Sequence, residues 1–213
     1  MTLLTRLEKH LGWLAVDNLP LFIVTAQAII YVWAMVKGDA SLLTLDPMAI
    51  RVGHEYWRLL TFLFVTQQQN PIFEFFFLYL LYIYGTALEQ EWGAFPFTLF
   101  YVLGALGTCA AAFWFGSNAG SFYLNTTLFL AFAAVHPNFE LLVFFFIPLK
   151  IKWLALLTWL WLGFQIFSSD AATRAAISIS LINYILFFAK THFDFLADTV
   201  RAYQHRRRFK GWQ

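Results

Sequence analysis

Apolar residues dominate the chain in six long runs, and short polar or aromatic-rich breaks separate these runs. A helix needs roughly 17–25 mostly apolar residues to cross the hydrocarbon core of a bilayer. Runs of this length can be placed at 19–36, 71–91, 94–115, 120–136, 149–167 and 172–189. The pattern predicts six membrane-spanning helices. The fourth and sixth are short or partly polar, so we expect them to be buried in the bundle.

The two ends of the chain depart from this pattern. Leucines recur at helical spacing over residues 2–14 with charged residues between them, which predicts an amphipathic helix lying on the membrane. Lysine and arginine crowd at the C-terminus. We therefore divide the chain into an interfacial helix at 1–18, a six-span domain at 19–190 and a basic cytosolic tail at 191–213.

The first loop, 37–70, is half apolar, so we expect it to dip into the outer leaflet. Asp46-Pro47 within it predicts a turn or a helix start. With both termini in the cytoplasm, ten of the 14 lysines and arginines lie on inner segments and the other four on outer ones. This distribution follows the positive-inside rule. We expect a multi-pass membrane protein in this orientation.

Composition agrees with a membrane protein and excludes several other classes. The chain is 61% hydrophobic and 12% charged, whereas a soluble domain is about half apolar and a quarter charged. A net charge of +2 is too small to suggest a nucleic-acid partner. Cys109 is the single cysteine, so no intramolecular disulfide can form. No histidines or carboxylates have metal-ligand spacing on one helix, and no glycine-rich phosphate loop occurs. We therefore expect neither metal nor cofactor.

Small residues recur at four-residue spacing in three predicted spans. This spacing lets helices approach closely in a membrane, where van der Waals contact must hold the bundle together. We expect the fourth and sixth spans to pack tightly against each other. The stripes are Gly104, Thr108 and Ala112 in the third span, Thr127 and Ala131 in the fourth, and Ala172, Ala176 and Ser180 in the sixth.

Two motifs connect the first loop with the second span. Trp57 and Arg58 stand in the loop, and the second span closes on Gly85 and Glu89, followed by Gly93. These residues resemble the rhomboid superfamily. An aromatic–proline–lysine–tryptophan series at 144–155, common in bacterial rhomboid-like proteins, extends the resemblance and implies a bacterial inner membrane. The resemblance implies an all-α integral membrane fold, a six-transmembrane-helix rhomboid-like bundle with a lipid-embedded first loop.

Arg58 needs a polar partner at the membrane boundary, because charges persist inside membranes mainly when they are paired. Glu89 or Glu91, at the end of the second span, would supply a carboxylate and fasten the first loop to that span. The alternative is that Arg58 extends alone to the lipid headgroups. The residues alone favour neither arrangement.

Active rhomboids are intramembrane serine proteases, and the resemblance locates where their site residues would stand. Phe73 and Phe77 occupy the positions of the oxyanion-binding histidine and asparagine of the second span. Phenylalanine follows Ser121, where the family motif has glycine after its serine. Ile177 or Ser178 stands in place of the histidine of the sixth span. Because a serine needs a base to become a nucleophile, we assign no catalytic residue and expect an inactive, derlin-like pseudoprotease.

The role that the resemblance implies is binding of transmembrane client proteins in membrane-protein quality control or trafficking. Its partners would be these clients, the lipid bilayer and a membrane protease or translocation complex. Polar residues within the spans are candidates for a client-binding interior. Hydrogen bonding between the protein's own helices explains the same residues, and we favour it because buried polar groups need partners in any case. The set is Asn125, Thr126, Thr127, Ser178, Ser180 and Asn183.

Two other functions remain open at this point. An active rhomboid intramembrane serine protease with an atypical site would use Ser121 or Thr127 as its nucleophile. A structural subunit of a larger membrane complex would bury the aromatic face at 144–146 against one fixed partner.

Overall fold

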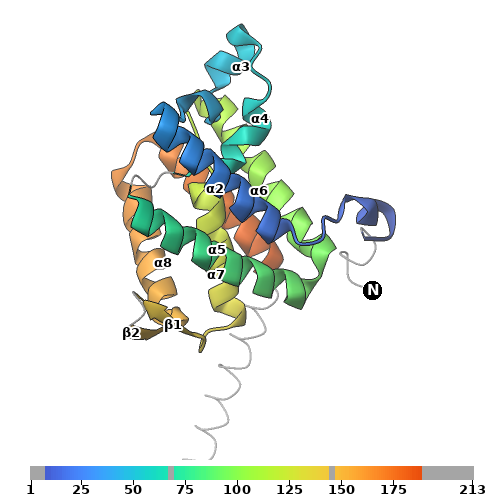
Figure 1. The fold of residues 1–213 in the computed structure, drawn as a ribbon, viewed down its shortest axis with the longest axis vertical. Helices are drawn as coiled ribbons and strands as arrows, with labels where there is room; N and C mark the ends of the chain where they lie inside the picture. Colours follow the sequence, from blue (N-terminus) through green and yellow to red (C-terminus); the bar gives the residue numbers. More distant parts are fainter. Residues whose placement is uncertain (1–7, 67–69, 144–146, 189–213) are drawn as a thin grey trace, which may run out of the picture.

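The computed structural model describes residues 8–66, 70–143 and 147–188, in which six apolar helices form the body of the molecule (Figure 1). Five of the described helices are long and apolar enough to cross a membrane, while α7, with 14 residues, is shorter. The chain is thus a helical multi-pass membrane protein, and each predicted run corresponds to a helix. The six are α2 Leu19–Lys37, α5 Pro71–Trp92, α6 Ala94–Phe115, α7 Phe122–Val135, α8 Ile151–Ser168 and a last helix Ala171–Phe188.

Helix boundaries follow from capping residues. The Asp46 carboxylate accepts hydrogen bonds from the two amides that open α3 Pro47–Gly53, which confirms the predicted helix start. The Asn70 side chain caps α5 in the same way. Proline occupies the first position of both helices, where its missing N–H is harmless. Gly93, at φ 92°, separates α5 from α6 by a turn that other residues rarely adopt.

The first loop forms a separate small layer at one end of the bundle, at the top of Figure 1. It contains η2 Ser41–Leu43, α3, α4 Arg58–Thr61 and η3 Phe62–Phe64. Leu45 at its centre is buried and pairs with the backbone of Ala119 between α6 and α7. The outer side of the layer carries many apolar side chains beside the exposed Arg51 and His54, and its embedding in lipid stays a prediction. Its exposed apolar side chains include Leu42, Met48, Val52, Trp57 and Leu60.

Arg58 is the polar centre of this layer and is only 5% exposed. Its Nε donates to the Glu55 carboxylate at 2.6 Å, and its Nη1 donates to the carbonyl oxygens of Ser41 at 2.6 Å and Thr44 at 3.0 Å. Neither of the two arrangements left open by the sequence occurs: Arg58 does not pair with Glu89 or Glu91, and it does not extend alone to the headgroups. The loop joins the N-terminal end of α5, whereas both glutamates lie near the other end of a helix about 33 Å long.

Glu89 instead holds the N-terminal segment. Its Oε1 accepts a hydrogen bond from the backbone amide of Asn18 at 2.7 Å. Beyond this attachment, residues 8–14, ending in η1 Gly12–Leu14, stand to one side of the bundle (Figure 1). The position of this segment on a membrane stays a prediction. Residues 1–7 of the predicted interfacial helix and the basic tail 191–213 lie outside the described residues.

Glycines permit close approaches between helices. A Cβ added to Gly85 of α5 would lie 2.9 Å from Pro20 Cβ, so α2 packs directly on this backbone. A Cβ at Gly104 of α6 would collide with Leu124 of α7 and lie 3.0 Å from Asn183 Nδ2 of the last helix. The fourth and sixth spans were expected to pack tightly together. In the structure, residues from both meet at Gly104 of the third-span helix.

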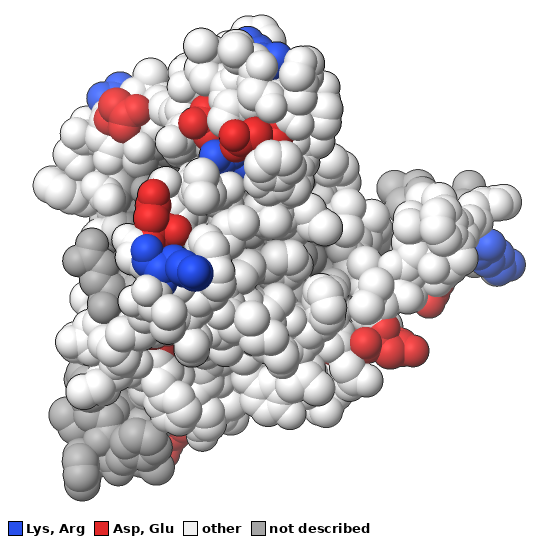
Figure 2. Space-filling view, turned by 45° about the horizontal axis from the view of Figure 1, so that its top comes forward, with Lys and Arg blue, Asp and Glu red and all other residues white. Residues whose placement is uncertain are grey.

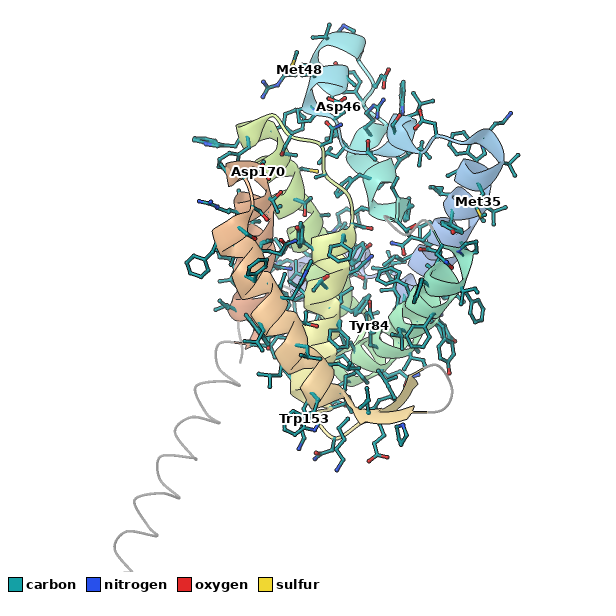
Figure 3. The ribbon with its side chains drawn as sticks, turned by 90° about the vertical axis from the view of Figure 1, so that its left-hand side faces the viewer. Met35, Asp46, Met48, Tyr84, Trp153 and Asp170 are labelled. Atoms are coloured by element: carbon teal, nitrogen blue, oxygen red, sulfur yellow. The ribbon has the colours of Figure 1, made fainter. Side chains whose placement is uncertain are left out.

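A short antiparallel hairpin precedes α8 and was not predicted from the sequence. β1 Glu140–Val143 pairs with β2 Ile147–Lys150, with Glu140 opposite Lys150. Trp153, in the first turn of α8, lies beside this hairpin at the end of the bundle opposite Asp46 and Asp170 (Figure 3). The aromatic residues 144–146, on which the subunit hypothesis depends, lie outside the described residues.

Charged side chains are sparse on the surface, and Figure 2 shows them as a few small groups on a largely uncharged face. Large apolar side chains point outward from the long helices, including Phe164 of α8 at 69% exposure and Leu186 of the last helix at 70%. An apolar surface of this extent is the one that a surrounding bilayer requires.

Replacing Gly85 with alanine is expected to destabilise the protein by about 1–3 kcal/mol, because the new methyl group would overlap Pro20 on the facing helix. Gly163→Ala is the matched control, since a Cβ at Gly163 meets no atom within 4 Å. Helix propensity should make that variant neutral or more stable by about 0.5–1 kcal/mol. Unfolding in mixed detergent micelles measures both. Equal stability of the two variants would contradict the close approach at Gly85.

Arg58→Lys should loosen the first loop while leaving the helices intact. A lysine nitrogen cannot donate to the Glu55 carboxylate and both carbonyls with the geometry of the guanidinium group. Losing one charge-assisted hydrogen bond, worth about 1.5–3 kcal/mol, should speed proteolysis within 39–57 roughly tenfold or more. Arg51→Lys is the control, because Arg51 is exposed and makes one 3.4 Å hydrogen bond, to the Phe113 carbonyl oxygen. Similar cleavage rates in both variants would refute the role of Arg58.

Candidate functional site

The candidate site is a groove on the side of the bundle, where α5 and α8 both pack against α7. The groove has a volume of about 240 Å³ and is mainly apolar. Aromatic side chains from all three helices form its walls, and three polar residues complete the lining with one leucine. The lining consists of Phe77, Leu80 and Tyr84 from α5, Phe122, Asn125, Thr126 and Phe129 from α7, and Thr158 and Trp161 from α8.

Helical periodicity gathers these residues, because positions three and four apart lie on one face of a helix. Aromatic contacts then join the faces. The rings of Phe122 and Trp161 meet edge to face with centroids 5.7 Å apart, which links α7 to α8. Tyr84 and Phe129 meet in the same way at 6.1 Å and link α5 to α7. Figure 3 shows Tyr84 in the region where α5 crosses α7.

Asn125 is the buried polar residue of the groove and is 1% exposed. Its Nδ2 donates to Ser121 Oγ at 3.3 Å, and its backbone carbonyl accepts a hydrogen bond from the Tyr84 hydroxyl at 3.5 Å. Its Oδ1 has no hydrogen-bond partner among the described residues. Burying an amide oxygen without a partner is costly, and Asn125 thus retains an unused acceptor.

The two threonines of the groove use their protons within their own helices. Thr126 donates to the Phe122 carbonyl oxygen at 2.8 Å, and Thr158 donates to that of Leu154 at 2.9 Å. This bond to the carbonyl four residues earlier is common for hydroxyls in helices. What the two side chains still offer to a ligand is oxygen lone pairs.

Behind the groove, Ser121 joins three parts of the chain. Its Oγ donates to the Val65 carbonyl oxygen at 3.0 Å and accepts from Gln27 Nε2 at 3.4 Å as well as from Asn125. Gln27 Nε2 also donates to the Leu63 carbonyl oxygen at 2.9 Å. The network therefore ties α2 and the end of the first loop to α7. Sequence reasoning missed Gln27, although an amide in the middle of the first apolar run was the available signal.

No histidine ring in the described part of the chain is hydrogen-bonded to Ser121. The His54 ring lies 3.1 Å from the Tyr56 hydroxyl, and the His136 ring stacks on Phe132 with centroids 4.9 Å apart. The Ser121 proton is directed to a backbone carbonyl, which cannot act as a general base. The arrangement can hold helices together, but the described residues offer this serine no proton acceptor for attack on a peptide.

The three polar residues predicted for the interior of the fourth span lie in two different places on α7. Asn125 and Thr126 line the groove, as described above. Thr127 is buried elsewhere on α7, and its hydroxyl donates to the Leu124 carbonyl oxygen at 2.8 Å. Whether any of these residues contacts a client stays a prediction.

The predicted polar residues of the sixth span do not line the groove. Asn183 is buried and its Nδ2 donates to the Phe100 carbonyl oxygen of α6 at 3.0 Å, an interhelical bond of the kind expected. Ser180 is buried, and its hydroxyl has no partner among the described residues. Ser178 is exposed, so it lies outside the interior to which the sequence assigned it.

The five motif residues stabilise other parts of the fold. As described above, Arg58 donates hydrogen bonds within the first loop, and Gly85 allows α2 to pack closely on α5. Glu89 accepts a hydrogen bond from the Asn18 amide, and Gly93 forms the turn between α5 and α6. Trp57 is exposed and its Nε1 donates to the Leu42 carbonyl oxygen at 3.4 Å.

A second cavity of about 410 Å³ lies at the first-loop end, between the turn after α6 and the start of the last helix. Its lining is more polar and includes Asn118, Tyr123, Asp170 and Thr173. Hydrogen bonding by Thr173 lowers the pKa of Asp170, which is therefore ionised at neutral pH. Across the described ranges, no three histidine, cysteine or acidic side chains gather as metal ligands would.

Glu74 is a buried acidic residue in the first turn of α5 and is 1% exposed. The carboxyl group of Glu74 interacts with Tyr31 of α2 and with Thr66, so it faces α2 and does not line the groove. The chain next to Thr66, residues 67–69, lies outside the described ranges.

Comparison with protein-family models finds none that matches the chain, and comparison with curated proteins finds no match. The rhomboid resemblance therefore depends on the sequence motifs alone.

Ser121→Ala should destabilise the protein by about 1–3 kcal/mol, because it removes a partner from Gln27, Asn125 and the Val65 carbonyl. The double variant with Gln27→Leu should lose less stability than the sum of the losses in the two single variants, since both residues act in one network. Ser178→Ala, at an exposed position of the last helix, is the control and should be neutral. Detergent unfolding of the four proteins in the cycle measures the coupling. Strict additivity would show that the network is not energetically linked.

Proposed function

We propose that this chain is a rhomboid-like pseudoprotease, which binds transmembrane client proteins through the lateral groove and performs no catalysis. The observation that carries the proposal is the groove itself, formed by aromatic residues of α5, α7 and α8 around Asn125. A concave, mostly apolar site with a few polar groups is the usual form of a binding site. The neighbouring surface supports entry from lipid, since Tyr79 of α5 and Leu160 of α8 are exposed apolar positions.

The resemblance to rhomboids supplies the wider frame of the proposal. Six apolar helices follow one another with an apolar first-loop layer after the first, as in the six-transmembrane-helix rhomboid-like bundle. α7 is the short member, about 21 Å long, whereas a bilayer core is about 30 Å thick. A short helix favours locally thinned lipid, which would ease lateral entry of a client.

In this proposal both termini lie in the cytoplasm of a bacterial cell, and the first-loop end faces outward. A client helix would enter the groove from the membrane and be held, sorted or passed to a membrane protease or translocation complex. The lack of catalysis is supported by the Ser121 hydroxyl, which donates to the Val65 carbonyl and accepts from two amides. The proposed role is thus membrane-protein quality control or trafficking.

Photo-crosslinking in native membranes tests client binding. A photoreactive residue at Trp161, which lines the groove, should capture many different membrane proteins in low yield. The same residue at Leu160, its neighbour on α8 outside the groove, is the matched control and should capture several-fold less. One stoichiometric partner at both positions would instead indicate a structural subunit. Equal capture at both positions would refute the groove as a client site.

A fluorophosphonate probe and a model transmembrane substrate test the absence of catalysis. We expect no labelling and no cleavage, because no described histidine can accept the Ser121 proton. Labelling that disappears in Ser121→Ala, or in Thr127→Val, would identify an atypical active protease and overturn the proposal.

A further inference from the structure

The hydrogen-bonding groups of the groove indicate which clients it would bind, an inference that depends on the proposed function. We propose that the groove selects transmembrane segments that carry an asparagine or glutamine at the depth of Asn125, in preference to segments with an apolar residue there. The selecting group is the unpaired Oδ1 of Asn125, which would accept a hydrogen bond from the client's carboxamide.

The hydroxyl donors of the groove are already in use, and so is one N–H of Asn125. Asn125 Nδ2 donates to Ser121, and the Tyr84 hydroxyl donates to the Asn125 carbonyl. The hydroxyls of Thr126 and Thr158 donate within their own helices. Besides the indole N–H of Trp161, what remains for a client is a set of oxygen acceptors, of which Asn125 Oδ1 has no partner among the described residues. A client therefore gains a hydrogen bond here by presenting an N–H or O–H group.

The absence of charge narrows the chemistry further. The groove lining contains no acidic or basic side chain. A cationic or anionic client group would lose its hydration here without gaining a counter-charge. The best match is a neutral donor.

Carboxamides fit this requirement better than hydroxyls. In a membrane helix, serine and threonine satisfy their own protons on the carbonyl four residues earlier, as Thr126 and Thr158 do here. The two N–H groups of an asparagine or glutamine lack a regular acceptor of this kind within their own helix, and lipid offers none. Clients with an exposed carboxamide therefore have an unmet donor, and the groove has an unmet acceptor.

Access to the acceptor requires the groove to widen, because Asn125 is only 1% exposed. The ring contact between Phe122 and Trp161, with centroids 5.7 Å apart, closes the α7–α8 side and must open when a helix enters. A client with an apolar residue separates these rings without gaining a hydrogen bond, whereas a carboxamide client forms one. The selection thus depends on the same movement that admits a client.

The test uses the full chain in phosphatidylcholine vesicles with single-span leucine–alanine helices that differ at one position. Binding is read by crosslinking from a photoreactive residue at Trp161 as the helix concentration is varied. The helix with asparagine at the depth of Asn125 should bind about threefold to fifteenfold more tightly than the helix with leucine there, since interhelical hydrogen bonds in membranes average about 0.6 and reach about 1.7 kcal/mol. Moving the asparagine two helical turns along the client should abolish this preference.

Asn125→Leu should remove the preference, so that the asparagine and leucine helices bind the variant equally, and a circular dichroism spectrum like that of the unaltered protein checks that the variant is folded. Thr127→Val is the matched control, since Thr127 is a buried polar neighbour outside the groove, and it should keep the preference. Equal binding of asparagine and leucine helices to the unaltered protein would refute the selection but leave client binding standing. No binding of either helix would refute the proposed function itself. If the Asn125→Leu variant still binds the asparagine helix more tightly, the assignment to Asn125 is wrong. The same holds if the preference is unchanged when the client asparagine is moved two turns along its helix.

Discussion

A bilayer offers no hydrogen bonds to the side chains that it surrounds, and this constraint explains how the polar residues of the chain are placed. Arg58 is enclosed by Glu55 and two backbone carbonyls of its own loop. Gln27 and Ser121 share one network with the last carbonyls of that loop. The bonds of Gln27 and Ser121 are buried, and they fasten the end of the first loop to the helices where water competes least.

Much of the helical framework could be predicted from the sequence. Helix boundaries agree with the apolar runs to within a few residues, because length and hydropathy decide which segments can lie in lipid. The helix cap at Asp46 could also be predicted, because capping depends only on residues that are adjacent in the sequence. The hairpin before α8 was not predicted, because the apolar residues around Pro148 fit a strand and a helix start equally well.

Partners across the fold were harder to predict than the elements themselves. Glu89 was a reasonable counter-charge for Arg58 by type, yet it lies near the opposite end of α5 and accepts from Asn18. Asn125 and Thr126 were recognised as polar residues within a span. The aromatic walls beside them were not, because the sequence does not show which faces of α5, α7 and α8 converge. Convergence depends on the packing of helices, which is decided by the whole bundle.

The link between Gln27 and Ser121 spans 94 positions of the chain, and it has a consequence for biogenesis. The ribosome makes the segment with Gln27 long before it makes Ser121, and α5 and α6 must be completed in between. During that interval, Gln27 can already donate to the Leu63 carbonyl, but the Val65 carbonyl still lacks Ser121, the donor that it has in the finished protein. The first half of the chain therefore cannot complete this network by itself. Insertion of α7 brings in Ser121, which then bonds both Gln27 and the Val65 carbonyl.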